Sequence, residues 1–161
     1  GDEDGDEAYP IQRLCLTNGN KCNEKAASFI ALLARLAIDF QSFEDNKRGG
    51  LLIENRYGGN IFNNLLYKFD SRVPGQNDLL LTLLIRMRRM GLFKKGDIKD
   101  FRLFYFLYNK IDFAERVFQF LVEWDPTSLL QTDDGGCLPL HWAAKQTSIR
   151  EFTIVFSYVI R

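Results

Sequence analysis

The residues best suited to chemistry gather around the single histidine of the chain. His141 follows two acids, Asp133 and Asp134, and a cysteine, Cys137. A histidine that acts as a general base needs a nucleophile and an orienting acid within hydrogen-bonding reach, and this segment supplies acids without an activated nucleophile. We therefore interpret His141 as a structural residue near the start of a helix and Cys137 as an unactivated thiol. We expect no enzymatic activity, no catalytic residue and no cofactor.

Metal-binding patterns are weak in this sequence. The first seven residues contain five acids and two glycines, and Asp2, Asp4 and Asp6 have the alternate spacing of calcium ligands. However, Glu7 stands where such a loop needs glycine, and Arg13 stands near the position of the bidentate acid. A segment of this composition repels itself and has little to bury, so we expect residues 1–8 to form a disordered acidic leader. We expect no metal site.

The cysteine count indicates the compartment. Cys15, Cys22 and Cys137 form no closely spaced pair and leave one thiol over, which is unlike a disulfide framework or a zinc site. We interpret all three as reduced thiols of an intracellular, cytoplasmic protein, and a nuclear location stays open. The longest apolar run, residues 26–38, carries Arg35 and is shorter than the roughly 20 residues of a membrane helix. No membrane association is expected.

Composition excludes two further classes. The 161 residues include 21 Lys plus Arg, 21 Asp plus Glu and 14 Phe, and 46% of the chain is hydrophobic. Such a chain buries enough apolar surface to fold, so it is not disordered as a whole. A formal net charge of zero argues against a dedicated nucleic-acid binder, which needs a basic footprint.

Apolar positions recur at three- and four-residue steps through most of the chain, which predicts helices. In the first helix, the predicted buried face consists of Ala26, Phe29, Ile30, Leu33, Leu36, Ala37 and Phe40. Gly91 and Pro126 end two of the helices. Aromatic residues between positions 101 and 113 have helical spacing and are interpreted as core. The predicted helices are 23–43, 78–90, 97–110, 112–124, 140–145 and 149–160.

The sequence also repeats itself. With a shift of 77 residues, 129–144 aligns with 52–66, and the pair Gly135-Gly136 falls on Gly58-Gly59. Both segments read as an apolar pair, a polar stretch, two glycines and a short apolar helix. The longer helices end near residues 40, 90, 124 and 160, which are 50, 34 and 36 apart. We predict about four units, each with two antiparallel helices and a connection.

Residues 133–144 read DDGGCLPLHWAA, and this segment resembles the ankyrin repeat signature D-x-x-G-x-T-P-L-H-x-A-A. Gly136 suits the positive φ of a tight turn, and Pro139 suits the first turn of a helix. Leu138 departs from the signature, because it replaces the threonine whose hydroxyl caps the helix. In the earlier unit, Ile61, Phe62 and Asn64 stand where the 77-residue alignment expects threonine, proline and histidine.

The resemblance implies a mainly all-α, ankyrin-type helical solenoid of about four helix pairs joined by short hairpin-like loops. Its repeat domain would cover residues 9–161, as a piece of a longer array. The approximate units are 9–43, 51–91, 97–124 and 126–160. Solenoids of this kind present an extended concave surface, so the expected function is a protein–protein interaction scaffold.

The resemblance also implies which residues contact the partner. On the family pattern these are the hairpin tips and the start of the first helix, with Trp142 as a candidate aromatic anchor. The expected contact residues are Arg56, Tyr57, Asn60, Asp134, Cys137, Trp142, Lys145 and Gln146. The partner is another protein.

A basic segment leaves two alternatives open. Between Arg86 and Arg102 the chain carries seven cations and two acids. This cluster is typical of a solvated helix end, and it also fits contact with an acidic partner or RNA, whose affinity would fall steeply with salt. The remaining alternative is a helical accessory domain of a larger enzyme.

Overall fold

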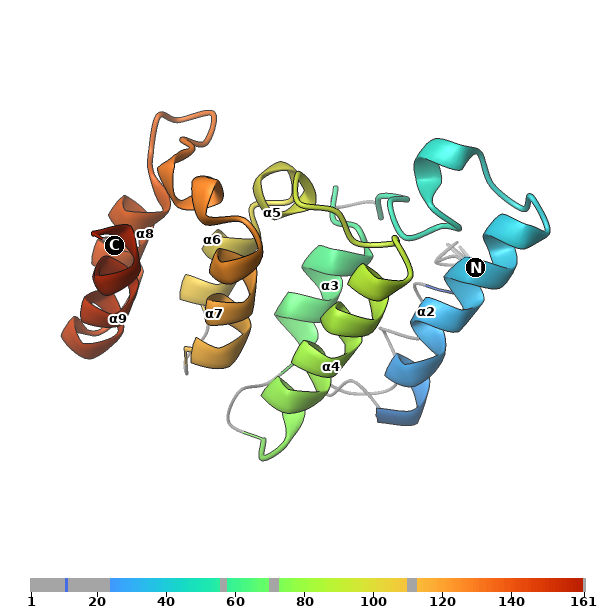
Figure 1. The fold of residues 1–161 in the computed structure, drawn as a ribbon, viewed down its shortest axis with the longest axis horizontal. Coiled ribbons are helices and arrows are strands. Elements are labelled where there is room, and N and C mark those ends of the chain that lie inside the picture. Colours follow the sequence, from blue (N-terminus) through green and yellow to red (C-terminus); the bar gives the residue numbers. More distant parts are fainter. Residues whose placement is uncertain (1–10, 12–23, 56–57, 70–72, 110–112, 161) are drawn as a thin grey trace, which may run out of the picture.

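The computed structural model describes residues 11, 24–55, 58–69, 73–109 and 113–160. The acidic leader, Cys15, Cys22, Arg56 and Tyr57 lie outside the described residues. Over the described ranges the chain is all-helical and contains no strand, which confirms the all-α class (Figure 1). The α-helices are α2 (Glu24–Asp39), α3 (Ile61–Lys68), α4 (Gln76–Arg89), α5 (Asp97–Asp100), α6 (Leu103–Tyr108), α7 (Glu115–Trp124), α8 (Pro139–Gln146) and α9 (Ile149–Val159), and the 3-10 helices are η1 (Asp45–Lys47) and η2 (Pro126–Leu130).

The helices form two layers that run side by side along the molecule (Figure 1). In one layer α3 packs on α6 and α6 packs on α8, while in the other α2 packs on α4 and α4 packs on α7. Helix α9 packs on α8 and closes the row opposite α2. The connections that contain η1 and η2 lie along the same edge of the row. Successive helices of each layer therefore contact one another along the row.

The predicted stop signals act as expected. After α4, Gly91 takes a φ of +71°, and the amide of Leu92 donates to the carbonyl of Met87 at 2.9 Å, as in a glycine cap. After α7, Pro126 begins η2 instead of extending the helix. The four helices α4, α7, α8 and α9 lie close to their predicted bounds.

The predicted helix at 97–110 is wrong in one respect, because the structure divides it into α5 and α6. Arg102, between them, has a φ of +50°, a left-handed conformation that a right-handed helix cannot contain. The carbonyl of Phe101 accepts a hydrogen bond of 2.7 Å from the Asn63 side chain of α3. A contact from a neighbouring helix thus holds the break, and the local sequence pattern carries no sign of it.

The first predicted helix exists, and its buried face is only partly the predicted one. Ile30 is buried as predicted, but the other residues that α2 buries are alanines, Ala27, Ala31 and Ala34. Phe29 and Phe40, predicted to face the core, are 52% and 78% exposed. The large residues of the predicted stripe other than Ile30 therefore lie on the outer side of the first described helix. No helix in the described part of the chain combines the length and apolar character needed to cross a membrane.

Aromatic side chains connect the two layers. Phe93 contacts Phe62 of α3 at 5.0 Å and Trp124 of α7 at 4.7 Å between ring centroids. Phe118 of α7 contacts Phe104 of α6 at 5.4 Å and lies fully buried. Such contacts combine apolar burial with ring–ring attraction. Phenylalanine side chains therefore contribute to packing both within a helix pair and between successive pairs.

A buried ion pair fixes the edge of the row that carries η1. Arg48, which follows η1, donates to the Asp97 carboxylate at 2.5 Å and to the Leu92 carbonyl at 3.3 Å. Asp97 is buried and also accepts the amide hydrogen of Lys94 at 2.6 Å. The pair thus joins the connection after α2 to the end of α4 and the start of α5.

We predict that Phe118→Ala lowers the free energy of unfolding by about 3–5 kcal/mol, since it leaves a cavity among three helices. Chemical denaturation followed by circular dichroism measures this loss. Phe156→Ala on the exposed side of α9 is the matched control, with an expected loss of about 1 kcal/mol or less. A loss below about 1 kcal/mol at Phe118 would contradict the packing role.

We also predict that Asp97→Ala lowers the free energy of unfolding by about 3–5 kcal/mol, because it leaves the Arg48 charge partly buried without a counter-charge. Asp39→Ala, which removes the exposed ion pair with Arg35, should cost only about 0.3–0.5 kcal/mol. A double variant with Arg48→Met should lose less than the sum of its single changes. Strict additivity would show that the two side chains act independently.

Candidate functional site

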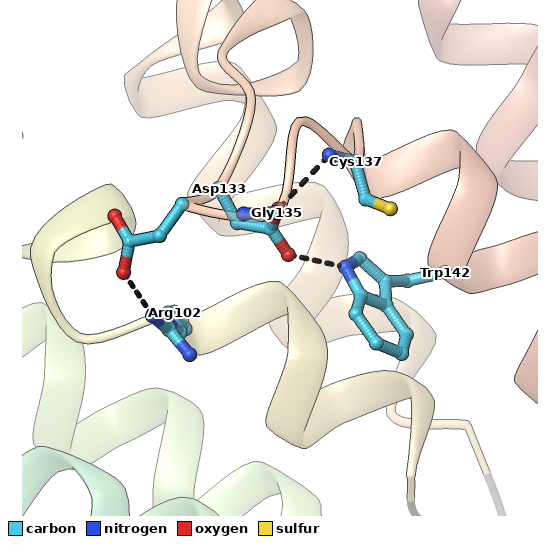
Figure 2. Close-up of polar contacts among 6 residues, drawn as sticks. Arg102, Asp133, Gly135, Cys137 and Trp142 are labelled. Atoms are coloured by element: carbon cyan, nitrogen blue, oxygen red, sulfur yellow. Dashed lines mark hydrogen bonds and ion pairs between the residues drawn. The ribbon is translucent and has the colours of Figure 1, made fainter.

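The turn before α8 is organised by one carboxylate, that of Asp133 (Figure 2). Its Oδ1 accepts the amide hydrogens of Gly135 and Cys137, each at 2.9 Å, and its Oδ2 accepts the Trp142 indole hydrogen at 2.8 Å. The amide of Asp133 donates to the Cys137 carbonyl at 3.0 Å, and Gly136 has a φ of +74°. Asp133 thus holds the turn together and also joins it to the helix that follows.

A second turn, before α3, has the same hydrogen-bond pattern. The amide of Asn55 donates to the Gly59 carbonyl at 2.8 Å, and the Asn55 side chain accepts the Gly59 amide hydrogen at 3.0 Å. Gly58 has a φ of +75°, so it occupies the position of Gly136. The structural correspondence is therefore 78 residues, and the predicted alignment at 77 is wrong by one. Pairing the two Gly-Gly sequences caused the error, because one turn uses its first glycine and the other uses its second.

The corrected correspondence explains the starts of α3 and α8. Asn60 caps α3 by accepting the Asn63 amide hydrogen at 3.2 Å, and Asn63 accepts the Asn60 amide hydrogen at 3.3 Å. At the equivalent place, His141 Nδ1 accepts the Leu138 amide hydrogen at 3.0 Å. Leu138 removes only the hydroxyl half of a reciprocal cap. His141 has the structural position that we predicted for it.

A pocket of about 550 Å³ lies between this turn and the preceding helix pair. On one side it is lined by α5 and α6, and on the other by the 131–137 connection and the first turns of α8. Buried Phe104 and Ser128 belong to its lining, and charged side chains contribute from both sides. An ion pair between Arg102 and Asp134 joins the two sides.

Two aromatic side chains from different helix pairs meet in this pocket. The rings of Tyr105 on α6 and Trp142 on α8 are perpendicular, with centroids 5.0 Å apart. Both remain partly accessible to solvent. The ammonium group of Lys145 lies 5.2 Å from the Trp142 ring, within the range of a cation–π interaction. The pocket thus combines aromatic surface with charge.

The structure brings together part of the predicted contact set. Asp134, Cys137 and Trp142 line the pocket, and Lys145 and Gln146 are exposed on the adjoining part of α8. Asn60 is 2% exposed, and its side chain caps α3, so it offers no surface to a partner. Under the 78-residue correspondence, Asn60 is equivalent to Leu138, which lies at the start of a helix. It is therefore not equivalent to a residue at the tip of the turn. Arg56 and Tyr57 lie outside the described residues.

The preceding unit also contributes to the pocket, although it has no recognisable turn motif. Lys99 and Arg102 come from the basic segment, which the sequence leaves open as a partner contact. Tyr105 was missed, because its helical spacing led to its interpretation as core, whereas it is 37% exposed and lines the pocket. Asp133 was identified as a motif position but not as the centre of the site. Its place at the start of the D-x-x-G pattern is the one signal that could have found it.

Some cations of the basic segment make contacts within the chain itself. Arg88 lies 4.7 Å from the Trp124 ring, Arg86 donates to the Ser28 carbonyl at 3.1 Å, and Arg102 pairs with Asp134. Four cations remain exposed near the end of α4 and around α5: Arg89, Lys94, Lys95 and Lys99. Three of the seven cations of the segment are therefore already engaged by contacts within the chain.

Among the residues that the structure describes, no cluster of side chains is suited to bind a metal ion. No group of three or more His, Cys, Asp or Glu side chains converges there. Cys137 is a half-buried free thiol whose amide is bound to Asp133. What the arrangement offers is a shaped surface with aromatic and charged groups.

The Asp133 network should depend on pH. The pKa of this carboxyl is lowered, first by the Cys137 amide and then by the Trp142 indole, with smaller contributions from the Gly135 amide and the charge of Arg102, against a partial opposing effect of burial. A lowered pKa means that the network contributes stability above about pH 4 and loses it as pH falls through the folded-state pKa. We predict that the NMR signal of the Trp142 indole hydrogen shifts over that acidic range, while the Trp124 signal serves as a reference. Asp133→Asn should abolish the shift, and an unchanged pH profile in that variant would contradict the assignment.

The site is thus defined by one carboxylate-centred turn and the pocket beside it. Comparisons of the chain with protein-family models, with curated proteins and with solved structures found no match. The function of this site is therefore inferred from the contacts of the described residues.

Proposed function

We propose that the chain is an ankyrin-like helical solenoid that acts as a non-enzymatic interaction scaffold and binds another protein through the pocket between α6 and α8. The observation that carries this proposal is the pocket itself, which joins Trp142 to Tyr105 across two helix pairs. A partly exposed aromatic side chain in a concave site is a typical anchor in protein interfaces. The exposed residues of the adjoining turn and helix extend the same surface.

The ankyrin resemblance is supported by three local features. The turn at Asp133 recurs at Asn55, the helices lie in two layers, and each layer passes from one pair to the next. Solenoids present continuous surfaces because successive units place equivalent positions side by side. In this proposal Asp134, Trp142 and Lys145 belong to that surface and contact the partner.

We predict that reversing charge beside the pocket removes a partner. The double variant Asp134→Lys, Lys145→Glu keeps the net charge, so loss of binding would reflect the local surface. Pull-down from a lysate, identification by mass spectrometry and titration of the purified partner measure the effect, which we expect to be at least a roughly tenfold loss of affinity.

Two controls make the experiment decisive. Asp45→Lys changes an exposed acid in η1, far along the row, and should retain the partner. Circular dichroism and thermal unfolding establish that each variant is folded. Folded double variants that retain every partner at unchanged affinity would overturn the assignment of this surface.

A further inference from the structure

The pocket carries charges of both signs. Among the described residues that line it, three are carboxylates, Asp100, Asp133 and Asp134, and two are cations, Lys99 and Arg102. Lys145, whose ammonium group lies over the Trp142 ring, adds a third cation beside the lining. The donors bound to Asp133 are two amides and an indole, which are neutral and leave its negative charge in place.

The aromatic walls favour the same sign of ligand. The faces of Tyr105 and Trp142 carry the negative side of the ring quadrupole, which attracts cations. The chain itself already uses these features for cations, because Lys145 lies over the Trp142 ring and Arg102 pairs with Asp134. A ligand that enters the pocket therefore meets two kinds of group, aromatic rings and carboxylates, and both attract positive charge.

Arginine fits this combination better than lysine. Its planar guanidinium group stacks on aromatic faces and also bonds to carboxylates in a fixed geometry. The Arg102–Asp134 pair is exposed, with 56% and 91% of the two side chains accessible, so it contributes little stability and is open to exchange. An incoming guanidinium group can share or replace the place of Arg102 at Asp134.

We infer that the pocket between α6 and α8 binds an arginine side chain of a partner polypeptide, with its guanidinium group held by the Tyr105 and Trp142 rings and by the carboxylates of Asp134 and Asp100. This inference rests on the proposed function, since it names the chemistry that the partner brings to the same site. It separates the pocket from a surface for acidic peptides or RNA phosphates, which the carboxylates of Asp100, Asp133 and Asp134 would repel.

The test uses small probes and the protein's own reporter. Three capped amino acids, N-acetyl N-methylamides of arginine, citrulline and glutamate, are titrated into the whole chain while the two indole signals are followed by NMR. Citrulline has the shape of arginine without its charge, so it isolates the electrostatic contribution. We expect the arginine probe to shift the Trp142 signal in a saturable way, with roughly tenfold weaker binding of citrulline and no effect of glutamate. The Trp124 signal should stay in place.

Two variants test whether the carboxylate of Asp134 attracts the arginine probe. Arg102→Gln removes the internal competitor and leaves Asp134 free, so the arginine probe should bind several-fold more tightly. Asp134→Asn should weaken binding by a similar factor, and the dispersed Trp142 indole signal checks that each variant keeps its turn. A pocket that selects acids would behave in the opposite way, with glutamate binding and loss of that binding in Arg102→Gln.

Each outcome separates this inference from the proposed function. Equal binding of arginine and citrulline, tighter binding of glutamate, or no shift with any probe would overturn the inference. If the double variant Asp134→Lys, Lys145→Glu still loses its protein partner in those cases, the interaction surface stands and only the ligand chemistry is wrong. If the partner is retained while the arginine probe binds, the pocket recognises arginine but is not the scaffold's contact surface.

Discussion

The buried pair of Arg48 and Asp97 holds the start of α5 against the connection that follows α2. It joins the connection after α2 to the end of α4 and to the start of α5. Lys99 in α5 and Arg102 between α5 and α6 form one side of the pocket. The geometry of the candidate site therefore depends on a charge pair that does not itself line the pocket. Burial makes this pair costly to break, whereas the exposed pair at the pocket itself is easily exchanged.

The two equivalent turns show that one backbone geometry can be specified by different side chains. Asp133 and Asn55 both accept amide hydrogens of their own turn, and His141 and Asn63 both accept the amide hydrogen at the start of a helix. What the positions share is an acceptor at the right distance along the chain. A carboxylate, an amide and an imidazole satisfy that requirement equally, so chemical role is preserved where residue identity is not.

Much of the helical arrangement could be predicted from the sequence, because apolar spacing and stop residues act locally. The bounds of α4 and α9 follow from periodicity, and Gly91 and Pro126 end their helices by their own conformational limits. The break at Arg102 could not be predicted, since it depends on a hydrogen bond from Asn63 in another helix. The buried face of α2 could not be fully predicted either, because which side of this helix is buried depends on how it packs on other parts of the chain, such as α4. In the site, the turn at Asp133 follows from its motif, whereas Tyr105 comes from a unit without one.

Packing in a row also distributes stability unevenly. Helix α9 lies at one end of the described row, and Ile149 at its start and Ile160 just after it are 87% and 67% exposed. Among the described helices, the α8–α9 pair contacts neighbours on one side, and a pair held from one side opens at a lower free energy than a pair held from both. The pocket lies at the seam between this end pair and the rest of the row. A ligand that contacts both sides of the seam would therefore hold the end pair against the rest of the row. Binding of the ligand would then slow the opening of that pair.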